Sequence, residues 1–148
     1  AMYKHILIPT DGSSLSGHAV AQGIELARAI GARVTGLFVA PAPTPVVFEG
    51  MVPVALMQPD EHAALTARAA ARYLGVIEKA TKQAGVAYEG VTVTDEFPAE
   101  TLLKTAAQRK CDLIVMASHG RRGLAGVLLG SETQKVLTHS KLPVLVCR

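Results

Sequence analysis

Residues 112–131 read DLIVMASHGRRGLAGVLLGS, and this stretch indicates the class of fold. Residues 112–117 form an almost continuous apolar run, which is typical of a strand buried on both faces of a parallel sheet. The loop from Ser118 to about Ser131 contains four glycines. A helix of about two turns is predicted after the loop, ending near His139. A strand, a glycine-rich loop and a helix in this order predict an α/β protein.

The rest of the chain continues the alternation of strands and helices. Apolar, β-branched segments predict further strands at residues 5–8, 33–40, 86–94 and 142–147. Cap and turn signals predict further helices at about residues 14–30 and 61–84 and from residue 98 onward. Ser14 or Ser16 is the expected cap of the first helix. This order predicts a doubly wound open sheet of five parallel strands with four helices and right-handed crossovers.

Composition limits the classes of function. The chain has 148 residues, which suggests one domain over residues 2–148. Hydrophobic residues make up 49% of the chain and aromatic residues 4%, with no tryptophan, so the core is expected to be aliphatic. Nucleic acid is not an expected partner, because the net charge is only +3 and stacking aromatics are scarce. No apolar run approaches the roughly 18–20 residues of a membrane span, so no membrane association is expected.

The two cysteines, Cys111 and Cys147, form no metal-binding spacing. Isolated cysteines and the lack of a secretory signal pattern predict a reducing, cytoplasmic location. The histidines also lack metal-ligand spacing, so no metal site is expected from the protein alone.

Residues 41–60 form an unusual segment with five prolines among valine, methionine and phenylalanine. Proline at this density argues against a regular helix or a central strand. A loop of about 20 residues is long for a compact domain and is often functional. The segment is expected either to cover a site or contact a partner, or to serve packing alone.

A ligand site is expected beyond the carboxyl ends of the strands, where the strand order reverses. This places it at residues 9–14, 39–40 and 117–131. Glycines in the last segment let backbone N–H groups approach an anion, and the helix start that follows adds free N–H donors. The spacing matches neither the P-loop nor the dinucleotide fingerprint. Anion binding and a plain flexible loop both remain open on this pattern alone.

Two motifs in the chain resemble those of the universal stress protein family. Nucleotide-binding members carry glycine, two residues, glycine, nine residues, then glycine with serine or threonine. Gly120, the nine residues after it and Gly130-Ser131 match, whereas Ala117 stands in place of the first glycine. Residues 6–13, ILIPTDGS, are similar to the family's first strand and turn. The resemblance covers nearly the whole chain and implies an adenine nucleotide alpha hydrolase-like sheet with strand order 3-2-1-4-5.

The resemblance also implies a site for ATP, or for ADP or AMP, together with Mg²⁺. Asp11 is implied to face the ribose. An Asx-turn or a helix cap is the alternative, and the binding role is favoured because Ser14 and Ser16 already offer caps. Val39 is implied to meet the adenine through its backbone, and Gly120 and Gly130 to let backbone donors reach the phosphates. The implied site comprises Pro9, Thr10, Asp11, Val39, Met116, Ala117, His119, Gly120, Arg121, Gly130, Ser131 and Glu132.

Several of these positions have more than one interpretation. Ser131 is implied to offer its hydroxyl and N–H to a phosphate, which is compatible with an N-cap role. His119 is interpreted as a hydrogen-bonding loop residue, because no nucleophile or orienting carboxylate accompanies it. The Cβ of Ala117 is expected to weaken or shift binding rather than abolish it. Glu132 would repel phosphates unless it points outward or helps to hold Mg²⁺, and Lys135 is placed to pair with it.

The resemblance implies a regulatory homodimer that pairs through the edge strand at residues 142–147, with at most slow ATP hydrolysis. One alternative is a slow ATPase or phosphotransferase, for which only Asp11, Ser131 and a bound metal are available. Another is a nucleotide-free dimerisation module, which Ala117 and Glu132 favour. A receiver domain lacks its acidic cluster here, and a flavodoxin-type protein lacks its aromatics.

Overall fold

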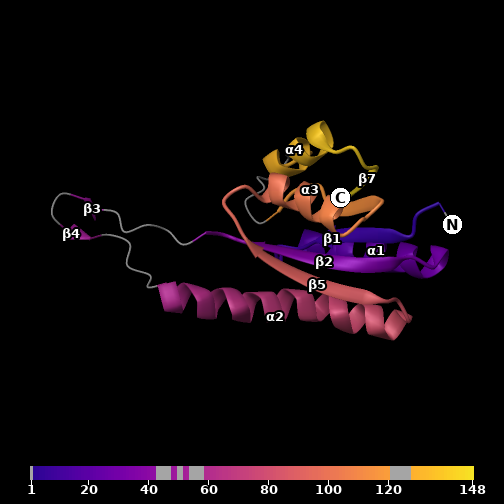
Figure 1. Cartoon of the computed structure of the whole chain (residues 1–148), viewed down its shortest axis with the longest axis horizontal. Coiled ribbons are helices and arrows are strands. Elements are labelled where there is room, and N and C mark those ends of the chain that lie inside the picture. The colour runs from indigo at the N-terminus through magenta and orange to yellow at the C-terminus, as the bar shows by residue number, and fades with distance from the viewer. Residues whose placement is uncertain (1, 43–47, 50–51, 54–58, 121–127) are drawn as a thin grey trace.

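The computed structural model describes residues 2–42, 48–49, 52–53, 59–120 and 128–148, and its central feature is a parallel sheet flanked by helices (Figure 1). The strands of this sheet are β1 (His5–Pro9), β2 (Arg33–Ala40), β5 (Tyr88–Thr94), β6 (Leu113–Ala117) and β7 (Val144–Cys147). The helices are α1 (Ser14–Ile30), α2 (Pro59–Ala84), α3 (Pro98–Gln108) and α4 (Ser131–His139). Two short strands, β3 (Phe48–Glu49) and β4 (Val52–Pro53), pair antiparallel outside the sheet.

The sheet has the strand order β5-β2-β1-β6-β7 in the described part of the chain, and every pairing in it is parallel. In chain order these strands are the third, second, first, fourth and fifth, so the expected order 3-2-1-4-5 is confirmed. The register places Ile6 of β1 between Val34 of β2 and Leu113 of β6. The two edges of the sheet are therefore β5 and β7, and β1 lies in its centre.

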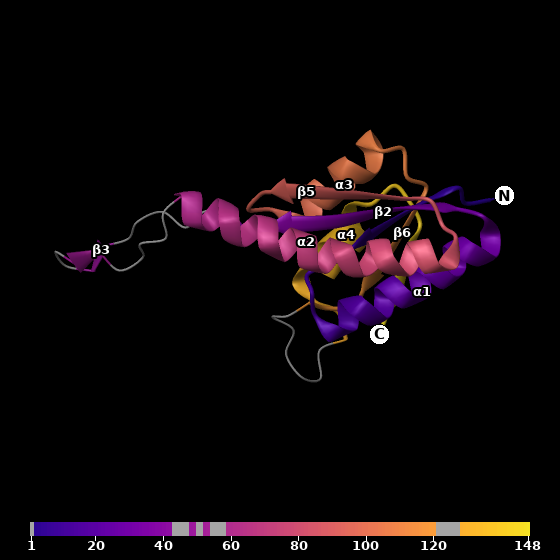
Figure 2. The same ribbon diagram turned by 90° about the horizontal axis from the view of Figure 1, so that it is seen from below.

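Alternating side chains of the central strands build a core on each face. Ile6 and Ile8 pack with apolar residues of α1 and α2, whereas Leu7 packs with residues of α3 and α4. All three side chains are fully buried, as the period of two in a strand requires for a sheet covered on both faces. Figure 2 shows α1 and α2 side by side on one face of the sheet.

The start of α1 differs from the sequence expectation. Its N-cap is Ser13, whose hydroxyl accepts a hydrogen bond from the Ser16 N–H at 3.1 Å. Ser14 is already helical, and the buried Ser16 hydroxyl donates to the Ser13 carbonyl at 3.0 Å. The prediction of Ser14 or Ser16 as the cap was wrong, because the turn at Gly12, with φ +78°, leaves Ser13 in the extended conformation that a cap needs.

Other boundaries move by one or two residues. The second helix begins at Pro59 rather than at residue 61, and β5 begins at Tyr88 rather than at residue 86. β7 begins at Val144, directly after Pro143, which has no N–H to donate. Much of the proline-rich segment, namely residues 43–47, 50–51 and 54–58, lies outside the described residues. Among the described helices, none is long and apolar enough to cross a membrane.

Candidate functional site

The carboxyl ends of β1 and β6 meet at the point where the strand order reverses. β1 and β6 are neighbours in the sheet, and the chain turns from β1 into α1 and from β6 toward α4 at this end. The Ser118 N–H, just beyond β6, donates to the Cys147 carbonyl at 2.8 Å, so the start of the glycine-rich loop is held by β7. The expected location of a ligand site is therefore a junction of two loops with the starts of α1 and α4.

The turn between β1 and α1 holds a carboxylate in a fixed position. The Thr10 N–H donates to the Leu37 carbonyl at 2.8 Å, and the Gly12 N–H donates to Thr10 Oγ1 at 3.2 Å. Asp11 Oδ1 accepts from the Ser13 N–H at 2.9 Å, which is the Asx-turn considered for this residue. Its second oxygen, Oδ2, faces Gly120, where a Cβ would collide with it. The Asx-turn thus directs the Asp11 carboxylate against the glycine-rich loop.

The start of α4 provides backbone donors at the same end of the sheet. Gly130 is the N-cap, with an extended backbone at φ −70° and ψ 161°, and its N–H donates to the Ser118 carbonyl at 2.7 Å. Ser131 is therefore the first helical residue rather than the cap. By helix geometry, the N–H groups of residues 131–133 have no intrahelical acceptor, and the helix dipole favours an anion beside them.

Close packing at Gly130 and a buried threonine fix the position of α4. A Cβ on Gly130 would lie 3.1 Å from both Cα and Cβ of His119, which is tighter than ordinary contact. The buried Thr133 hydroxyl donates to the Ala117 carbonyl at 3.0 Å. These contacts join the start of α4 to the end of β6, so they fix the position of the α4 N–H donors relative to the loop.

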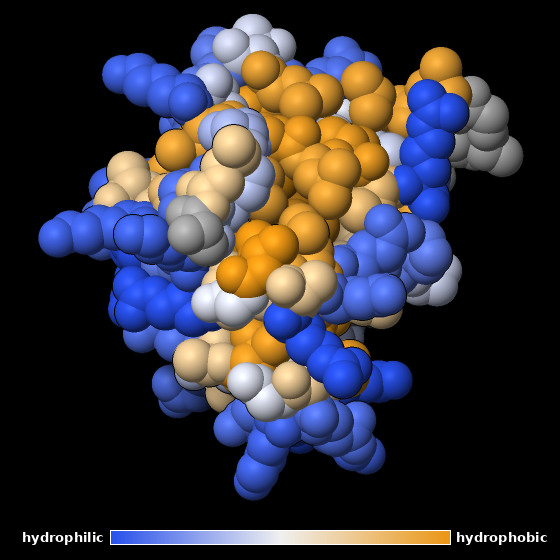
Figure 3. Space-filling model, turned by 90° about the vertical axis from the view of Figure 1, so that its right-hand side faces the viewer, coloured by the Kyte–Doolittle hydropathy of each residue, from blue (hydrophilic) through white to orange (hydrophobic). Residues whose placement is uncertain are grey.

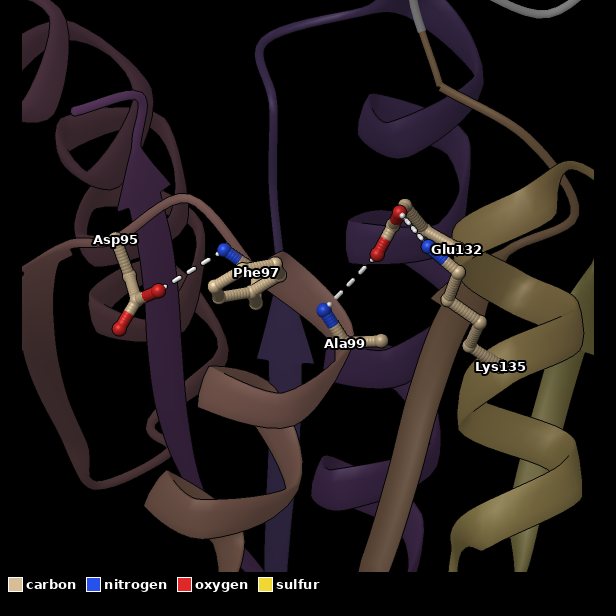
Figure 4. Close-up of polar contacts among 5 residues, drawn as sticks. All are labelled: Asp95, Phe97, Ala99, Glu132 and Lys135. Carbon is tan, nitrogen blue, oxygen red and sulfur yellow. Dashed lines mark hydrogen bonds and ion pairs between the residues drawn. The ribbon is translucent and has the colours of Figure 1, made fainter.

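The Glu132 side chain points toward α3. Its Oε2 accepts from the Ala99 N–H at 3.0 Å, and its Oε1 lies 3.1 Å from Lys135 Nζ (Figure 4). Phe97, the N-cap residue of α3, makes no side-chain capping bond, so Glu132 supplies the acceptor from outside the helix. Of the alternatives considered for Glu132, the outward orientation and the pairing with Lys135 are those observed.

The remaining predicted residues lie at or near this junction. Pro9 is the last residue of β1, and Met116 and Ala117 are buried at the end of β6. His119 Nδ1 lies 3.3 Å from the Gly120 carbonyl, a local contact within the loop. Val39 is half-buried one strand away, on β2, and packs with the core on the α3 side. Arg121 lies outside the described residues.

One contributor to the junction was not expected from the sequence. The ring of Tyr73, on α2, covers Gly12, where a Cβ would collide with it. Tyr73 also makes an edge-to-face contact with Phe38 of β2, with ring centroids 5.4 Å apart. A tyrosine in an alanine-rich helix gives no signal of this contact, because its partners are distant in sequence.

Two of the surface hollows formed by the described residues border α2. One, of about 220 Å³, lies between α1 and α2, next to the junction of β1, β6 and α4. It is lined by Thr10, Gly12, Ser13, Arg72 and Tyr73, among others. The other, of about 540 Å³, lies between α2 and β5 and is lined mainly by alanine and threonine. In the described part of the chain, no three histidine, cysteine or acidic side chains are grouped to hold a metal.

Comparison with known proteins agrees with this arrangement. The sequence profile of the Universal stress protein family matches residues 2–148. The chain belongs to the universal stress protein family. It is 36% identical to a universal stress protein of Thermus aquaticus over 147 residues, which covers 99% of this chain and 100% of that protein.

Two further similar proteins extend the comparison. Universal stress protein MJ0531 of Methanocaldococcus jannaschii is 31% identical over 153 residues, covering 99% of this chain and 83% of that protein. A universal stress protein solved in complex with cAMP superimposes with a TM-score of 0.70 at 25% identity, covering 100% of this chain and 98% of that one.

Proposed function

We propose that this universal stress protein binds an adenine nucleotide, with ATP, ADP and AMP as candidates, at the junction of β1, β6 and α4. The observation that carries the proposal is the position of the Asp11 carboxylate, whose Oδ2 faces Gly120 in the loop that leads to α4. A carboxylate suits the hydroxyls of a ribose, and the N–H groups at the start of α4 suit a phosphate. The glycine-rich loop contacts the Asp11 carboxylate at Gly120 and leads to the N–H groups at the start of α4.

The departure at Ala117 does not argue strongly against this function. Ala117 is buried at the end of β6, and its carbonyl already accepts the Thr133 hydroxyl. The backbone there is therefore engaged in holding α4, and a methyl is the smallest side chain that can be added. The similar protein in complex with cAMP supports the nucleotide as the class of ligand.

The proposal includes a regulatory homodimer that pairs through β7. In the described sheet β7 has a neighbour on one side only, β6, and Leu145 within it is 43% exposed. Figure 3 shows a broad apolar area on the right-hand side of the molecule as drawn in Figure 1, the side on which both β7 and the N-terminus are labelled. An uncharged edge strand is suited to pairing with a second copy through a two-fold axis. Leu145→Lys is expected to shift the sedimentation of the protein from dimer to monomer, and an unchanged dimer would contradict this part.

Hydrolysis of the nucleotide is expected to be slow. Phosphoryl transfer needs a positioned nucleophile or water and strong stabilisation of charge. Asp11 and Ser131 are the side chains that we assign to such a step, together with a metal brought by the ligand. We propose that the protein acts as a regulator whose state depends on the bound nucleotide, rather than as an enzyme that hydrolyses it.

Calorimetric titration of the protein, stripped of co-purified ligand, with ATP·Mg²⁺ and with AMP tests nucleotide binding. Gly130→Glu introduces a charge and a side chain where Gly130 contacts His119, so it is expected to abolish binding. Gly75→Glu is the matched control, because a Cβ on Gly75 meets nothing within 4 Å. Saturable binding that only Gly130→Glu removes supports the proposal. No binding of either nucleotide at millimolar concentration would leave the dimerisation module as the better account.

A further inference from the structure

The turn between β1 and α1 contacts two other parts of the chain. At Gly12, the ring of Tyr73 on α2 occupies the space that a Cβ would need. At Asp11, the Oδ2 oxygen occupies the space that a Cβ on Gly120 would need. Two neighbouring residues of the turn therefore lie against α2 and against the glycine-rich loop, both of which are distant from the turn in sequence.

The hydrogen bonds inside this turn are local and only partly buried. The Gly12 N–H donates to Thr10 Oγ1 at 3.2 Å, and the Ser13 N–H donates to Asp11 Oδ1 at 2.9 Å. Water competes for such groups, so the net contribution of each bond is small. Gly12, with φ +78°, also has the conformational freedom of a residue without a Cβ. A contact from outside the turn is therefore expected to decide how rigid the turn is.

Tyr73 is itself fixed by its neighbours. Its ring makes an edge-to-face contact with Phe38 of β2, with ring centroids 5.4 Å apart and an angle of 82° between the ring planes. Phe38 is buried together with Ala70, which lies one helical turn before Tyr73 on α2, and Tyr73 packs against this small cluster. Because the ring is held against the sheet through β2, it presents a fixed surface to Gly12.

A hollow beside the ring makes the turn sensitive to the size of this side chain. The hollow, of about 220 Å³, lies between α1 and α2, which run side by side in Figure 2, and Tyr73 lines it together with Thr10, Gly12 and Ser13. Structure around a truncated side chain relaxes only in part, so a smaller residue at this position would enlarge the hollow. Gly12 would then border open space, and the turn would sample further conformations.

We propose that Tyr73 is a positioning residue, whose ring holds the turn between β1 and α1 in the conformation that directs the Asp11 carboxylate at Gly120. The consequence for ligand affinity rests on the proposed nucleotide-binding function. Tyr73 acts without touching the nucleotide: it keeps the ribose acceptor preorganised, so that binding does not have to select one turn conformation from several. The ligand site therefore extends to α2, through a residue that acts on Asp11 by way of Gly12.

Calorimetric titration with ATP·Mg²⁺ and with AMP tests this role. Tyr73→Leu removes the ring and is expected to weaken each nucleotide that the wild type binds by about fivefold, because only a fraction of the molecules then has the competent turn. Tyr73→Phe keeps the ring and is expected to bind within about twofold of the wild type. Such a rescue assigns the effect to the ring rather than to the hydroxyl.

Tyr88 provides the matched control. It is also a tyrosine packed against α2, but it lies at the amino end of β5, where its hydroxyl donates to the Leu74 carbonyl at 3.2 Å. Tyr88→Leu is expected to lower the thermal stability about as much as Tyr73→Leu does and to leave nucleotide affinity unchanged. Equal losses of affinity in the two variants would overturn the proposal, because a general loosening of α2 would then account for both.

Hydrogen exchange in the ligand-free protein separates this inference from nucleotide binding. The Ser13 N–H, which donates to Asp11 Oδ1, reports how firmly the turn is held. Its exchange is expected to be about fivefold faster in Tyr73→Leu and unchanged in Tyr73→Phe and Tyr88→Leu. Unchanged exchange in Tyr73→Leu would overturn the positioning role. If the wild type binds neither nucleotide at millimolar concentration, the proposed function fails, and exchange at Ser13 alone decides the role of Tyr73.

Discussion

The two ends of the sheet use their polar groups in opposite ways. At the amino end, Asp112 accepts from the backbone N–H groups of Lys4 and His5 at 2.9 and 3.0 Å, and His5 Nε2 lies 2.6 Å from Thr35 Oγ1. These groups are engaged in holding neighbouring strands together. At the carboxyl end, the Asp11 carboxylate faces Gly120 of the glycine-rich loop, and the first N–H groups of α4 have no acceptor within the helix. The polar groups at the amino end hold the fold together, and those at the carboxyl end are the ones to which we assign the proposed ligand.

Two glycines, one at each end, give the largest expected contrast. Gly12 and Gly31 both have positive φ, +78° and +71°, but Tyr73 covers Gly12 whereas nothing lies within 4 Å of a Cβ on Gly31. Gly31→Ala is expected to cost about 1 kcal/mol for the left-handed backbone alone. Gly12→Ala is expected to cost about 3 kcal/mol, because overpacking against Tyr73 is added, and to abolish nucleotide binding. Urea unfolding and calorimetry measure both effects, and equal costs would contradict the contrast.

Two aspartates separate stability from binding. Asp112→Ala removes the acceptor for two backbone N–H groups at the amino end and is expected to cost about 2 kcal/mol without changing nucleotide affinity. Asp11→Ala removes the acceptor for the Ser13 N–H, which is expected to cost about 1 kcal/mol, and it is expected to weaken AMP binding about tenfold through loss of the ribose acceptor. Weaker AMP binding in Asp112→Ala than in Asp11→Ala would break the division of roles.

A threonine pair within α4 tests how firmly the helix start must be held. Thr133→Val removes the buried hydroxyl bond to the Ala117 carbonyl and is expected to cost about 1 kcal/mol and to weaken AMP binding a few-fold. Thr138→Val is the control, because the exposed Thr138 hydroxyl bonds only within the helix, to the Gln134 carbonyl at 2.8 Å. Thr138→Val is expected to have the same thermal stability and the same affinity for AMP as the wild-type protein. Equal behaviour of the two variants would mean that α4 does not depend on β6 for its position.

The smallest expected effect is a pH dependence that originates at the amino end. Burial, followed by the charge of Arg33, lowers the pKa of His5 from its ordinary value of 6.5, and Glu89, Asp112 and the Arg109 backbone oppose this shift. The buried His5 Nδ1 has no hydrogen-bond partner among the described residues. The unfolded chain therefore binds a proton at a higher pH than the folded chain does.

This shift predicts that the free energy of unfolding decreases as the pH falls below 6.5 toward the lowered pKa of His5, and that the His5 contribution is fully present above 6.5. Urea unfolding between pH 7 and pH 5 measures the slope. His5→Val is expected to reduce it, whereas substitution of the exposed His139 with glutamine should not. Identical slopes in His5→Val and wild type would contradict the assignment.

Periodicity in the sequence was enough to predict the sheet, its four helices and the carboxyl end as the place to look for a site. The exact start of α1 could not be predicted, because three nearby serines are each able to cap a helix. The turn at Gly12 is what selects Ser13. The orientation of Glu132 could not be predicted, because it depends on Ala99, 33 residues earlier in the chain. The contact between the Tyr73 ring and Gly12 could not be predicted either, because it depends on how α2 packs against the start of α1.

The most direct test of the division between the two ends is a map of backbone amide chemical shifts on adding AMP to isotope-labelled protein. We predict the largest changes at Gly12, Gly120 and the amides of residues 131–133, with Lys4, His5 and Asp112 unchanged. Saturable changes centred on the amino end, or none at millimolar AMP, would contradict the assignment of the ligand site to the carboxyl end.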